Sequence, residues 1–323
     1  MNKSYDINRE QLLSWAKEVL VDELTSVEDI AVTAFSYVLK INASDKTYYL
    51  KKTPPKLYIE SSVLDILNKE CGLENVPKVI ARNDNLHCFL MPSCGELTLR
   101  TLFEDQIQTD LLYEGVNSYV GLQKATASSV HKFLEMGVPD WRVDNLPNIY
   151  AEFLHDDKRL AEWGLNDEEK LRCKNSMELF EKLCADLQSL GLPSVLNHSD
   201  FHPNAMLLDQ ESHEIRIIDL GEVTIGNPLF PLASCITNYL EHRWQIRANE
   251  DEYIEIKSSI LNQWSVQGED VMDLVEIIGP LNYVLSFREL MELCDHNFPK
   301  WHKWIKLAFF DYLDNLENRY KGL

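Results

Sequence analysis

Short apolar runs separated by polar turns fill most of the first 91 residues, after one stretch with helical spacing. Residues 8–24 repeat leucine, alanine and valine every three or four positions, which predicts an amphipathic helix with Asn8 as its N-cap. Strands are predicted where β-branched and aromatic residues gather, over Asp29–Val32, Ser36–Ile41, Thr47–Lys52 and Leu86–Met91. Between the third and fourth strands, Val63, Leu64 and Leu67 predict a second helix.

The pattern of the remaining chain is helical. Helices are predicted over residues 115–136, 228–244, 250–266, 270–296 and 298–319. Another is predicted to begin after Asn166, because Glu169 completes a capping box ahead of a long run of spaced apolar residues. We therefore expect an α+β fold with an N-terminal lobe over 1–91, a hinge over 92–95 and a C-terminal lobe over 96–323.

One polar motif interrupts the helical part. Two short apolar runs, Ala205–Leu208 and Ile215–Ile218, flank a polar segment and predict a β-hairpin. A loop containing Asp200 and Asn204 precedes the first run, and Asp219 follows the second. Because a hairpin folds its two ends together, these three side chains are expected to converge.

Two carboxylates and an amide in this arrangement suit phosphoryl transfer. One carboxylate orients a hydroxyl and accepts its proton, while the other oxygen atoms coordinate magnesium. The alternative is a structural loop, since aspartate and asparagine are ordinary turn residues. The order and spacing of the parts, with Gly226-Asn-Pro228 shortly afterwards, favour the phosphoryl-transfer hypothesis.

The segment from His198 to Ala233 resembles the nucleotide-site signature of the aminoglycoside phosphotransferase and choline kinase group. That group shows His-Gly-Asp-Leu-His-x-x-Asn, then Ile-Asp-Trp or Ile-Asp-Phe, then Gly-Asp-Pro. Here Ala205 stands where the group has its metal-binding asparagine, Asn204 comes one residue early, and Asn227 and Pro231 replace aspartates that are common in the group. The run Gly-Val-Pro-Asp-Trp-Arg at 137–142 resembles a bacterial branch of the same group.

The resemblance implies a bilobal protein-kinase-like fold, with a small antiparallel-sheet N-terminal lobe and a large, mainly helical C-terminal lobe. It also implies an enzyme that uses ATP and Mg²⁺ to phosphorylate a hydroxyl group of a small molecule. Asp200 is the implied catalytic base, and His198 of the same motif is the second residue predicted to be catalytic. Asp219 is the implied magnesium ligand, with Asn204 or Glu222 assisting.

The nucleotide-binding residues are likewise implied by the resemblance. Lys51 corresponds to the strand lysine that contacts the α- and β-phosphates, and Lys52 is its rival because the choice depends on strand register. Glu60 corresponds to the helix glutamate that pairs with that lysine. Ser36, in a glycine-free loop after the first strand, is either a phosphate donor or a plain turn residue.

The hinge at residues 92–95 is expected to bind adenine through its backbone. Adenine needs one acceptor and one donor from such a segment. Pro92 has a carbonyl but no N–H and suits the acceptor position, while Ser93 or Cys94 supplies the donor.

The composition of the chain limits which partners and which cell compartment are expected. The 323 residues carry a net charge of −21, a field that repels nucleic acid and anionic membranes and would attract a cationic acceptor, although solubility explains it equally well. Seven scattered cysteines without a Cys-x-x-Cys pair, no run of 18 apolar residues and no apolar stretch at the start favour a cytoplasmic protein with reduced thiols.

Two alternatives remain open at this point. Ala205 is compatible with a catalytically weakened nucleotide-binding protein that acts as a sensor or scaffold, although Asp200, Asp219 and Lys51 favour an enzyme. Transfer of AMP instead of a phosphoryl group is not distinguished by the sequence. Neither the acceptor, nor ATP over GTP, nor the oligomeric state is fixed by it.

Overall fold

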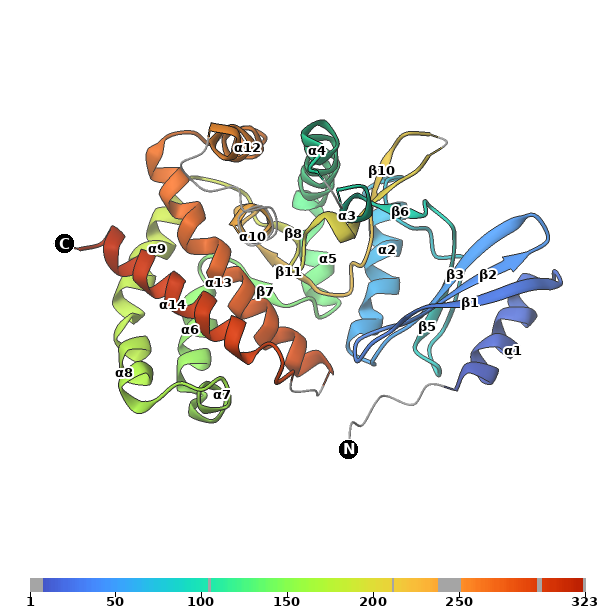
Figure 1. Ribbon diagram of the computed structural model, residues 1–323, viewed down its shortest axis with the longest axis horizontal. Coiled ribbons are helices and arrows are strands. Elements are labelled where there is room, and N and C mark those ends of the chain that lie inside the picture. Colours follow the sequence, from blue (N-terminus) through green and yellow to red (C-terminus); the bar gives the residue numbers. More distant parts are fainter. Residues whose placement is uncertain (1–7, 104–105, 211, 238–250, 295–297, 322–323) are drawn as a thin grey trace. The chain divides into compact units, whose positions relative to one another are not determined.

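The computed structural model describes residues 8–103, 106–210, 212–237, 251–294 and 298–321 (Figure 1). The chain forms two compact units. Unit 1 comprises Met1–Leu102, Asn204–Glu222 and Leu290–His296, and unit 2 comprises Phe103–Pro203, Val223–Glu289 and Asn297–Leu323. The predicted boundary at 92–95 stays a prediction, but β5 ends at Pro92 and the next strand belongs to a different sheet.

Unit 1 is built on an antiparallel five-stranded sheet in the order β1-β2-β3-β5-β4 (Figure 1). Its strands are β1 (Leu24–Val32), β2 (Tyr37–Ala43), β3 (Lys46–Lys52), β4 (Ala81–Asn83) and β5 (Cys88–Pro92). Helix α1 (Arg9–Leu20) is capped by Asn8, whose side chain accepts from the Gln11 N–H, as predicted. Leu12 and Ala16 of α1 pack on the buried face of β2 and β3, which forms the core of this sheet.

The hairpin predicted from the apolar runs belongs to the same unit. Strands β9 (Met206–Leu208) and β10 (Ile215–Ile217) pair antiparallel, and β6 (Leu97–Thr98) adds to β9 ahead of the short helix α3 (Leu99–Leu102). The backbone N–H of Ile217 donates to Asn75 O at 2.9 Å, which ties β10 to the segment that follows α2.

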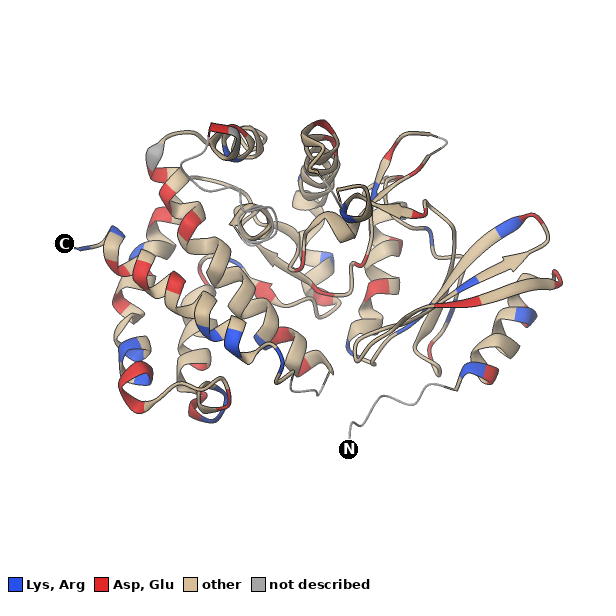
Figure 2. Ribbon diagram, viewed as in Figure 1, with Lys and Arg blue, Asp and Glu red and all other residues tan. Residues whose placement is uncertain are grey.

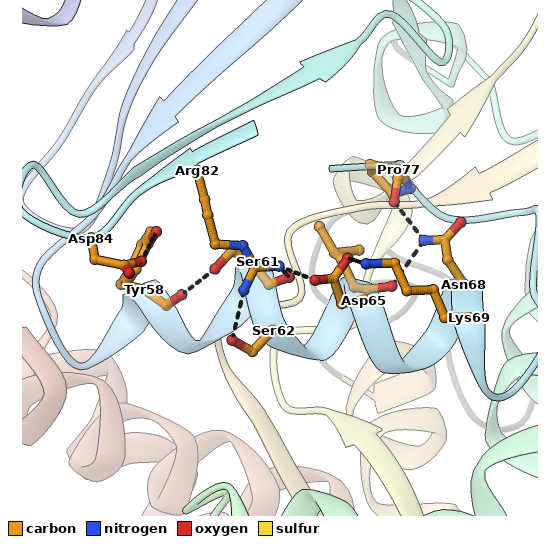
Figure 3. Close-up of polar contacts among 10 residues, drawn as sticks. Tyr58, Ser61, Ser62, Asp65, Asn68, Lys69, Pro77, Arg82 and Asp84 are labelled. Atoms are coloured by element: carbon orange, nitrogen blue, oxygen red, sulfur yellow. Dashed lines mark hydrogen bonds and ion pairs between the residues drawn. The ribbon is translucent and has the colours of Figure 1, made fainter. Parts of the chain in front are cut away.

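Helix α2 (Glu60–Lys69) follows a 3-10 turn, η1 (Leu57–Ile59), and is anchored by polar contacts (Figure 3). Arg82 of β4 pairs with the Asp65 carboxylate and donates to the Ser61 carbonyl at 3.1 Å. Asn68 donates to Pro77 O at 2.9 Å. These contacts supplement the burial of the apolar side chains of α2 and fix the position of its first residue, Glu60.

Unit 2 is mainly helical around a small sheet. Its helices are α4 (Thr109–Thr126), α5 (Val130–Glu135), α6 (Leu146–His155), α7 (Asp157–Glu162), α8 (Asp167–Asn175), α9 (Met177–Ser189), α10 (Leu229–Ser234), α12 (Asp251–Asn262), α13 (Glu269–Cys294, of which residues 290–294 belong to unit 1) and α14 (His302–Arg319). Strand β11 (Val223–Gly226) lies between β7 (Asp140–Trp141), which is parallel to it, and β8 (Val195–His198), which is antiparallel. Strand β8 is therefore an edge strand.

Some predicted helices are wrong in extent. The first ends at Leu20, because Val21 adopts a left-handed conformation (φ 60°) and Leu24 pairs with Ala43 in the sheet. The helix predicted over 115–136 begins earlier and breaks at a 3-10 turn, Ala127–Ser129. There the Thr126 hydroxyl donates to the Gln123 carbonyl, a local bond that competes with helical continuation.

Two further helix predictions also needed correction. The capping box at Asn166 and Glu169 is present, but the predicted helix is two helices separated at Ser176, whose side chain bonds to the Cys173 carbonyl at 2.6 Å. The predicted helix 228–244 begins at Leu229, and residues 238–244 lie outside the described part of the chain. Strands β4, β6, β7, β8 and β11 were not predicted.

Acidic residues recur along the helices of unit 2, and Figure 2 shows them on α13 and α14. Within the described residues, no helix is both long and apolar enough to cross a membrane.

Candidate active site

Adjacent lysines at the end of β3 have different partners. Both are buried, at 7% exposure for Lys51 and 9% for Lys52. Successive side chains of a strand point to opposite faces. Lys51 Nζ lies 2.6 Å from Glu60 Oε2 and also pairs with the Asp219 carboxylate, whereas Lys52 Nζ donates to the Leu86 carbonyl at 2.7 Å. The register therefore places Lys51, and not Lys52, with the two carboxylates.

Glu60 is the first residue of α2 and is 2% exposed. Gly221 packs against it, since a Cβ at that position would lie 3.4 Å from Glu60 Oε2. Burial raises the pKa of the Glu60 carboxyl group, although the Lys51 charge opposes that shift. Burial alone would lower the pKa of Lys51, but the Asp219 and Glu60 carboxylates outweigh it and raise that pKa. Lys51 is therefore held as a cation at neutral pH.

Asp219 stands two residues beyond β10 in a left-handed backbone conformation, with φ 66°. Aspartate tolerates this region better than most residues, and such strain often occurs at functional sites. The Ile218 N–H beside it donates to the Ala205 carbonyl at 3.0 Å. The Asp219 side chain is 63% exposed, so it contacts buried Lys51 while remaining accessible to solvent.

These groups line a cavity of about 280 Å³ that is formed within unit 1. Its polar lining residues include Ser36, Lys51, Glu60 and Asp219. Its apolar walls come from β1, β2, β5 and the β9–β10 hairpin, namely Ile30, Ala31, Val38, Met91, Leu207 and Ile218. A cavity that combines apolar side chains with a buried cation suits a nucleotide, which has an apolar base and anionic phosphates.

The predicted hinge residues differ in their access to the cavity. Pro92 and Cys94 line it together with Gly95. Ser93 is not among the lining residues, and its N–H donates to the Thr47 carbonyl at 2.8 Å. Of the two residues proposed as the donor to adenine, Cys94 is therefore the one beside the cavity.

The loop between β1 and β2 is organised by Thr33, which sequence reasoning overlooked. Its hydroxyl accepts the Ser36 N–H at 2.9 Å, and its own N–H donates to the Ser36 carbonyl at 2.9 Å. This side chain–backbone turn holds the loop without glycine and leaves Ser36 at the cavity. The Thr-x-x-Ser spacing is a recognisable signal for such a turn.

The remaining metal-site predictions fall in unit 1. Asn204 lies in the 3-10 turn Pro203–Ala205 and is partly exposed, as is Glu222, whereas Ala205 is 3% exposed. Among the described residues no group of three or more His, Cys, Asp or Glu side chains is placed to hold a metal ion. Mg²⁺ in nucleotide sites is typically held by one or two carboxylates plus the phosphates, so this oxygen-donor set fits Mg²⁺.

The predicted base belongs to unit 2. Asp200 follows β8 with its side chain 62% exposed, and His202 Nε2 lies 3.3 Å from its Oδ2. His198 is 3% exposed, and its ring lies beside Phe201. Its backbone N–H donates to the Tyr119 hydroxyl at 2.8 Å. The motif thus presents Asp200 to solvent and buries His198. Lys51, Glu60 and Asp219 are brought into contact within unit 1, and Asp200 and His198 lie in unit 2.

Comparisons with solved structures identify the fold. A GDP complex of an aminoglycoside 2'-phosphotransferase-IIIa mutant matches with a TM-score of 0.65 and 15% identity, covering 97% of this chain and 99% of that chain. Choline kinase LicA from Streptococcus pneumoniae matches with a TM-score of 0.61 and 12% identity, covering 97% and 100%. Plasmodium vivax ethanolamine kinase matches with a TM-score of 0.59 and 13% identity, covering 97% and 90%. The predicted kinase-like α+β fold is confirmed.

Sequence comparisons give the family. A search of curated proteins finds no match. The model of the phosphotransferase enzyme family (APH) matches residues 31–255, a span that includes Lys51, Asp200 and Asp219. This confirms the predicted family and class of enzyme: the chain belongs to the phosphotransferase enzyme family.

Proposed function

We propose that the protein is a small-molecule kinase that transfers the γ-phosphoryl group of ATP to a hydroxyl group of a small, cationic acceptor. The observation that carries the proposal is the ion group of Lys51, Glu60 and Asp219, which lines the unit 1 cavity. A buried cation fixed by two carboxylates is suited to binding phosphates, and phosphoryl transfer depends mainly on positioning and charge neutralisation.

The cavity offers a place for each part of the nucleotide. Lys51 would contact the phosphates, and the Ser36 hydroxyl would donate to one of them. The base would lie between the apolar walls, with the Pro92 carbonyl and the Cys94 N–H as its backbone partners. One acceptor and one donor at the hinge is the pair that adenine needs, which favours ATP.

Asp219 is the proposed principal ligand of Mg²⁺, with Asn204 or Glu222 assisting. Its exposed carboxylate stands at the cavity beside Lys51. Bound Mg²⁺ would neutralise the charge on the phosphates. Asp200 would orient the acceptor hydroxyl and accept its proton, a role that suits an exposed carboxylate.

An aromatic group in unit 2 supports a cationic acceptor. Tyr283 and Phe287 of α13 have ring centroids 4.7 Å apart, and Phe287 and Trp301 have centroids 4.9 Å apart. Burial raises the pKa of Tyr283 to about 12, and the negative charge of Asp200 adds to that shift. Aromatic faces attract cations within about 6 Å, so an amino or ammonium group of the acceptor fits here.

The second candidate is a nucleotide-binding sensor or scaffold without turnover. Ala205 favours it, because a buried alanine stands where the resemblance places a metal-binding asparagine. The presence of Asp200 in addition to Lys51 and Asp219 favours the enzyme, since a protein that only binds a nucleotide does not need a base as well.

A product screen tests the proposal. The protein is incubated with ATP, Mg²⁺ and amino alcohols, amino sugars, hydroxy amino acids or neutral sugars, and both ADP and pyrophosphate are measured. We expect ADP formation to rise with one cationic class and to depend on Asp200. Nucleotide binding with neither product would support the sensor, pyrophosphate would indicate AMP transfer, and absence of nucleotide binding would reject both candidates.

A further inference from the structure

The carbonyl group immediately before Asp200 is held by two side chains of one helix. Asn282 Nδ2 donates to the Ser199 carbonyl at 3.1 Å, and Ser286 Oγ donates to the same oxygen at 3.3 Å. The donors are one helical turn apart on α13, and they are 2% and 8% exposed. Residues four apart face the same side of a helix, so both donors point at one target.

This contact acts on the backbone of Asp200. The Ser199 carbonyl and the Asp200 N–H belong to one planar peptide group, which also contains both Cα atoms. Fixing the carbonyl oxygen from two directions therefore fixes the plane from which the Asp200 side chain leaves. No charged group is needed for this, and the carboxylate itself remains exposed.

Helix α4 holds the strand that leads into this peptide. Strand β8 is an edge strand, so the N–H groups that point away from β11 need other partners. The Leu196 N–H donates to the Thr126 hydroxyl at 3.1 Å, and the His198 N–H donates to the Tyr119 hydroxyl at 2.8 Å. Helix α4 thus holds the β8 backbone at Leu196 and His198, and α13 holds the next carbonyl, that of Ser199.

We propose that Asn282 and Ser286 are positioning residues that aim Asp200 by clamping the Ser199–Asp200 peptide plane. The proposal rests on the proposed function, because it takes Asp200 as the group that orients the attacking oxygen. Helix α13 then has two roles, since Tyr283 and Phe287 of the proposed acceptor wall are the next residues along it. Helix α13 would therefore position both Asp200 and the proposed acceptor wall.

The same helix offers a matched control. Pro280 within α13 has no N–H, so it cannot donate to the Glu276 carbonyl four residues earlier. Asn315 of α14 donates to that carbonyl at 3.0 Å. Asn315 therefore donates to a backbone carbonyl, as Asn282 does, but its acceptor is the Glu276 carbonyl within α13 and not the Ser199 carbonyl.

The test measures ATP hydrolysis to water with Mg²⁺ and no organic acceptor, so that it does not depend on the acceptor's identity. Asn282→Ala and Ser286→Ala should lower kcat by about 10- to 100-fold, the order expected when a reacting group is misplaced. The Kd of ADP with Mg²⁺, measured by calorimetry, should not change. Ser286→Thr keeps the hydroxyl donor and should retain kcat, while Asn315→Ala should lower the Tm and leave kcat unchanged.

Every outcome of this test either supports or overturns the proposed clamp. A wild-type kcat for both alanine variants, or an equal loss of kcat in Ser286→Thr and Ser286→Ala, would overturn the clamp. If Asn282→Ala fails to fold, the two Ser286 variants still give the answer. Wild-type hydrolysis by Asp200→Asn would instead remove the base from the proposed function, so failure of the function is distinguishable from failure of the clamp alone.

Discussion

Lys51 in unit 1 and Asp200 in unit 2 carry opposite charges, and the fold holds them in opposite ways. Lys51 is 7% exposed, and its ammonium group is held by the carboxylates of Glu60 and Asp219. Asp200 has a side chain that is 62% exposed, and the backbone before it is held by neutral donors from α13.

The difference follows from what each group has to meet. A buried cation is costly without a partner, so Lys51 needs carboxylates to stay charged before any phosphate arrives. The proposed base Asp200 must reach its acceptor through open space, so the fold can hold only its backbone. Loss of Lys51 should therefore change both stability and nucleotide binding, whereas loss of the Asp200 charge should change turnover alone.

The largest effect is expected for Asp200→Asn. The amide has nearly the same shape as the carboxylate but cannot accept the hydroxyl proton, and removal of a positioned base costs about 10²–10⁴ in rate. Turnover should fall by that factor, measured as ADP release. The Kd of ADP with Mg²⁺ should not change, because the nucleotide cavity is formed by unit 1.

A fully exposed carboxylate elsewhere in unit 2 supplies the control. The Asp167 side chain is at the solvent-exposed start of α8, and Asp167→Asn should leave turnover at the wild-type level. Equal turnover in the Asp200 and Asp167 variants would remove the contrast between the two units, because the base would then be a structural residue.

Lys51→Met should have the second-largest effect. Unlike Asp200→Asn, it should reduce both nucleotide binding with turnover and the stability of the fold. Nucleotide affinity and turnover should fall, the latter by about 10²–10³, because a donor that meets developing charge is lost. The free energy of unfolding should also fall by about 3–5 kcal/mol, because buried Glu60 loses the ammonium group that compensates it. Calorimetry and chemical denaturation separate the two losses.

Two variants sharpen this result. Lys52→Met removes the neighbouring buried lysine, whose ammonium group donates to the Leu86 carbonyl, and should leave nucleotide affinity close to wild type. Lys51→Met combined with Glu60→Gln removes both charges and should recover stability without recovering turnover. If Lys52→Met weakened nucleotide binding as much as Lys51→Met, the register would not distinguish the two lysines.

Local sequence patterns predicted what depends on local physics. The Asn8 cap, the capping box at Asn166 and the hairpin of residues 205–218 were all foreseen, because each is determined by residues a few positions apart. The helix break after Thr126 was not foreseen: its hydroxyl donates to the nearby Gln123 carbonyl, but it also accepts the Leu196 N–H from a strand 70 positions away.

The candidate site was likewise predictable only where residues close together in the sequence determine it. Motif spacing placed Asp200 and Asp219 at the ends of one hairpin, but the choice between Lys51 and Lys52 needed the pairing of β3 with β5. The clamp on Ser199 comes from residues 83 and 87 positions away, and neither has a motif of its own. Such contacts become visible only when the helices are packed.

Asp219→Asn should have a smaller effect that is confined to magnesium. Asparagine tolerates the left-handed backbone at this position, so the change removes charge without adding strain. Changes around a metal ligand cost about 10–100-fold in affinity, and removal of the ligand should cost at least as much. ADP should bind to the variant with little dependence on Mg²⁺, as measured by titration with and without the ion.

The outcome also tests the division of roles in unit 1. If the variant kept its full magnesium dependence, the ligand role would pass to Glu222, the other carboxylate of the predicted set. If it lost ADP binding without magnesium as well, Asp219 would be needed to hold Lys51, whose ammonium group it pairs with.

The smallest effect is expected for Ala205→Asn, which installs the residue that the family resemblance places there. Ala205 is 3% exposed and its carbonyl accepts the Ile218 N–H at 3.0 Å, so a larger side chain must find room next to the strand that leads to Asp219. A buried amide without partners costs about 1–3 kcal/mol, and the Tm should fall accordingly.

Magnesium affinity should nevertheless rise a few-fold if the site is only weakened by the alanine. A double-mutant comparison tests whether Asn204 replaces the absent asparagine ligand. If it does, its removal should lower magnesium affinity only while that ligand is absent. Asn204→Ala should lower magnesium affinity in the wild-type background and have little effect beside Ala205→Asn. Equal effects in both backgrounds would mean that Asn204 does not stand in for the missing asparagine, and that Ala205 is a packing residue at the start of β9.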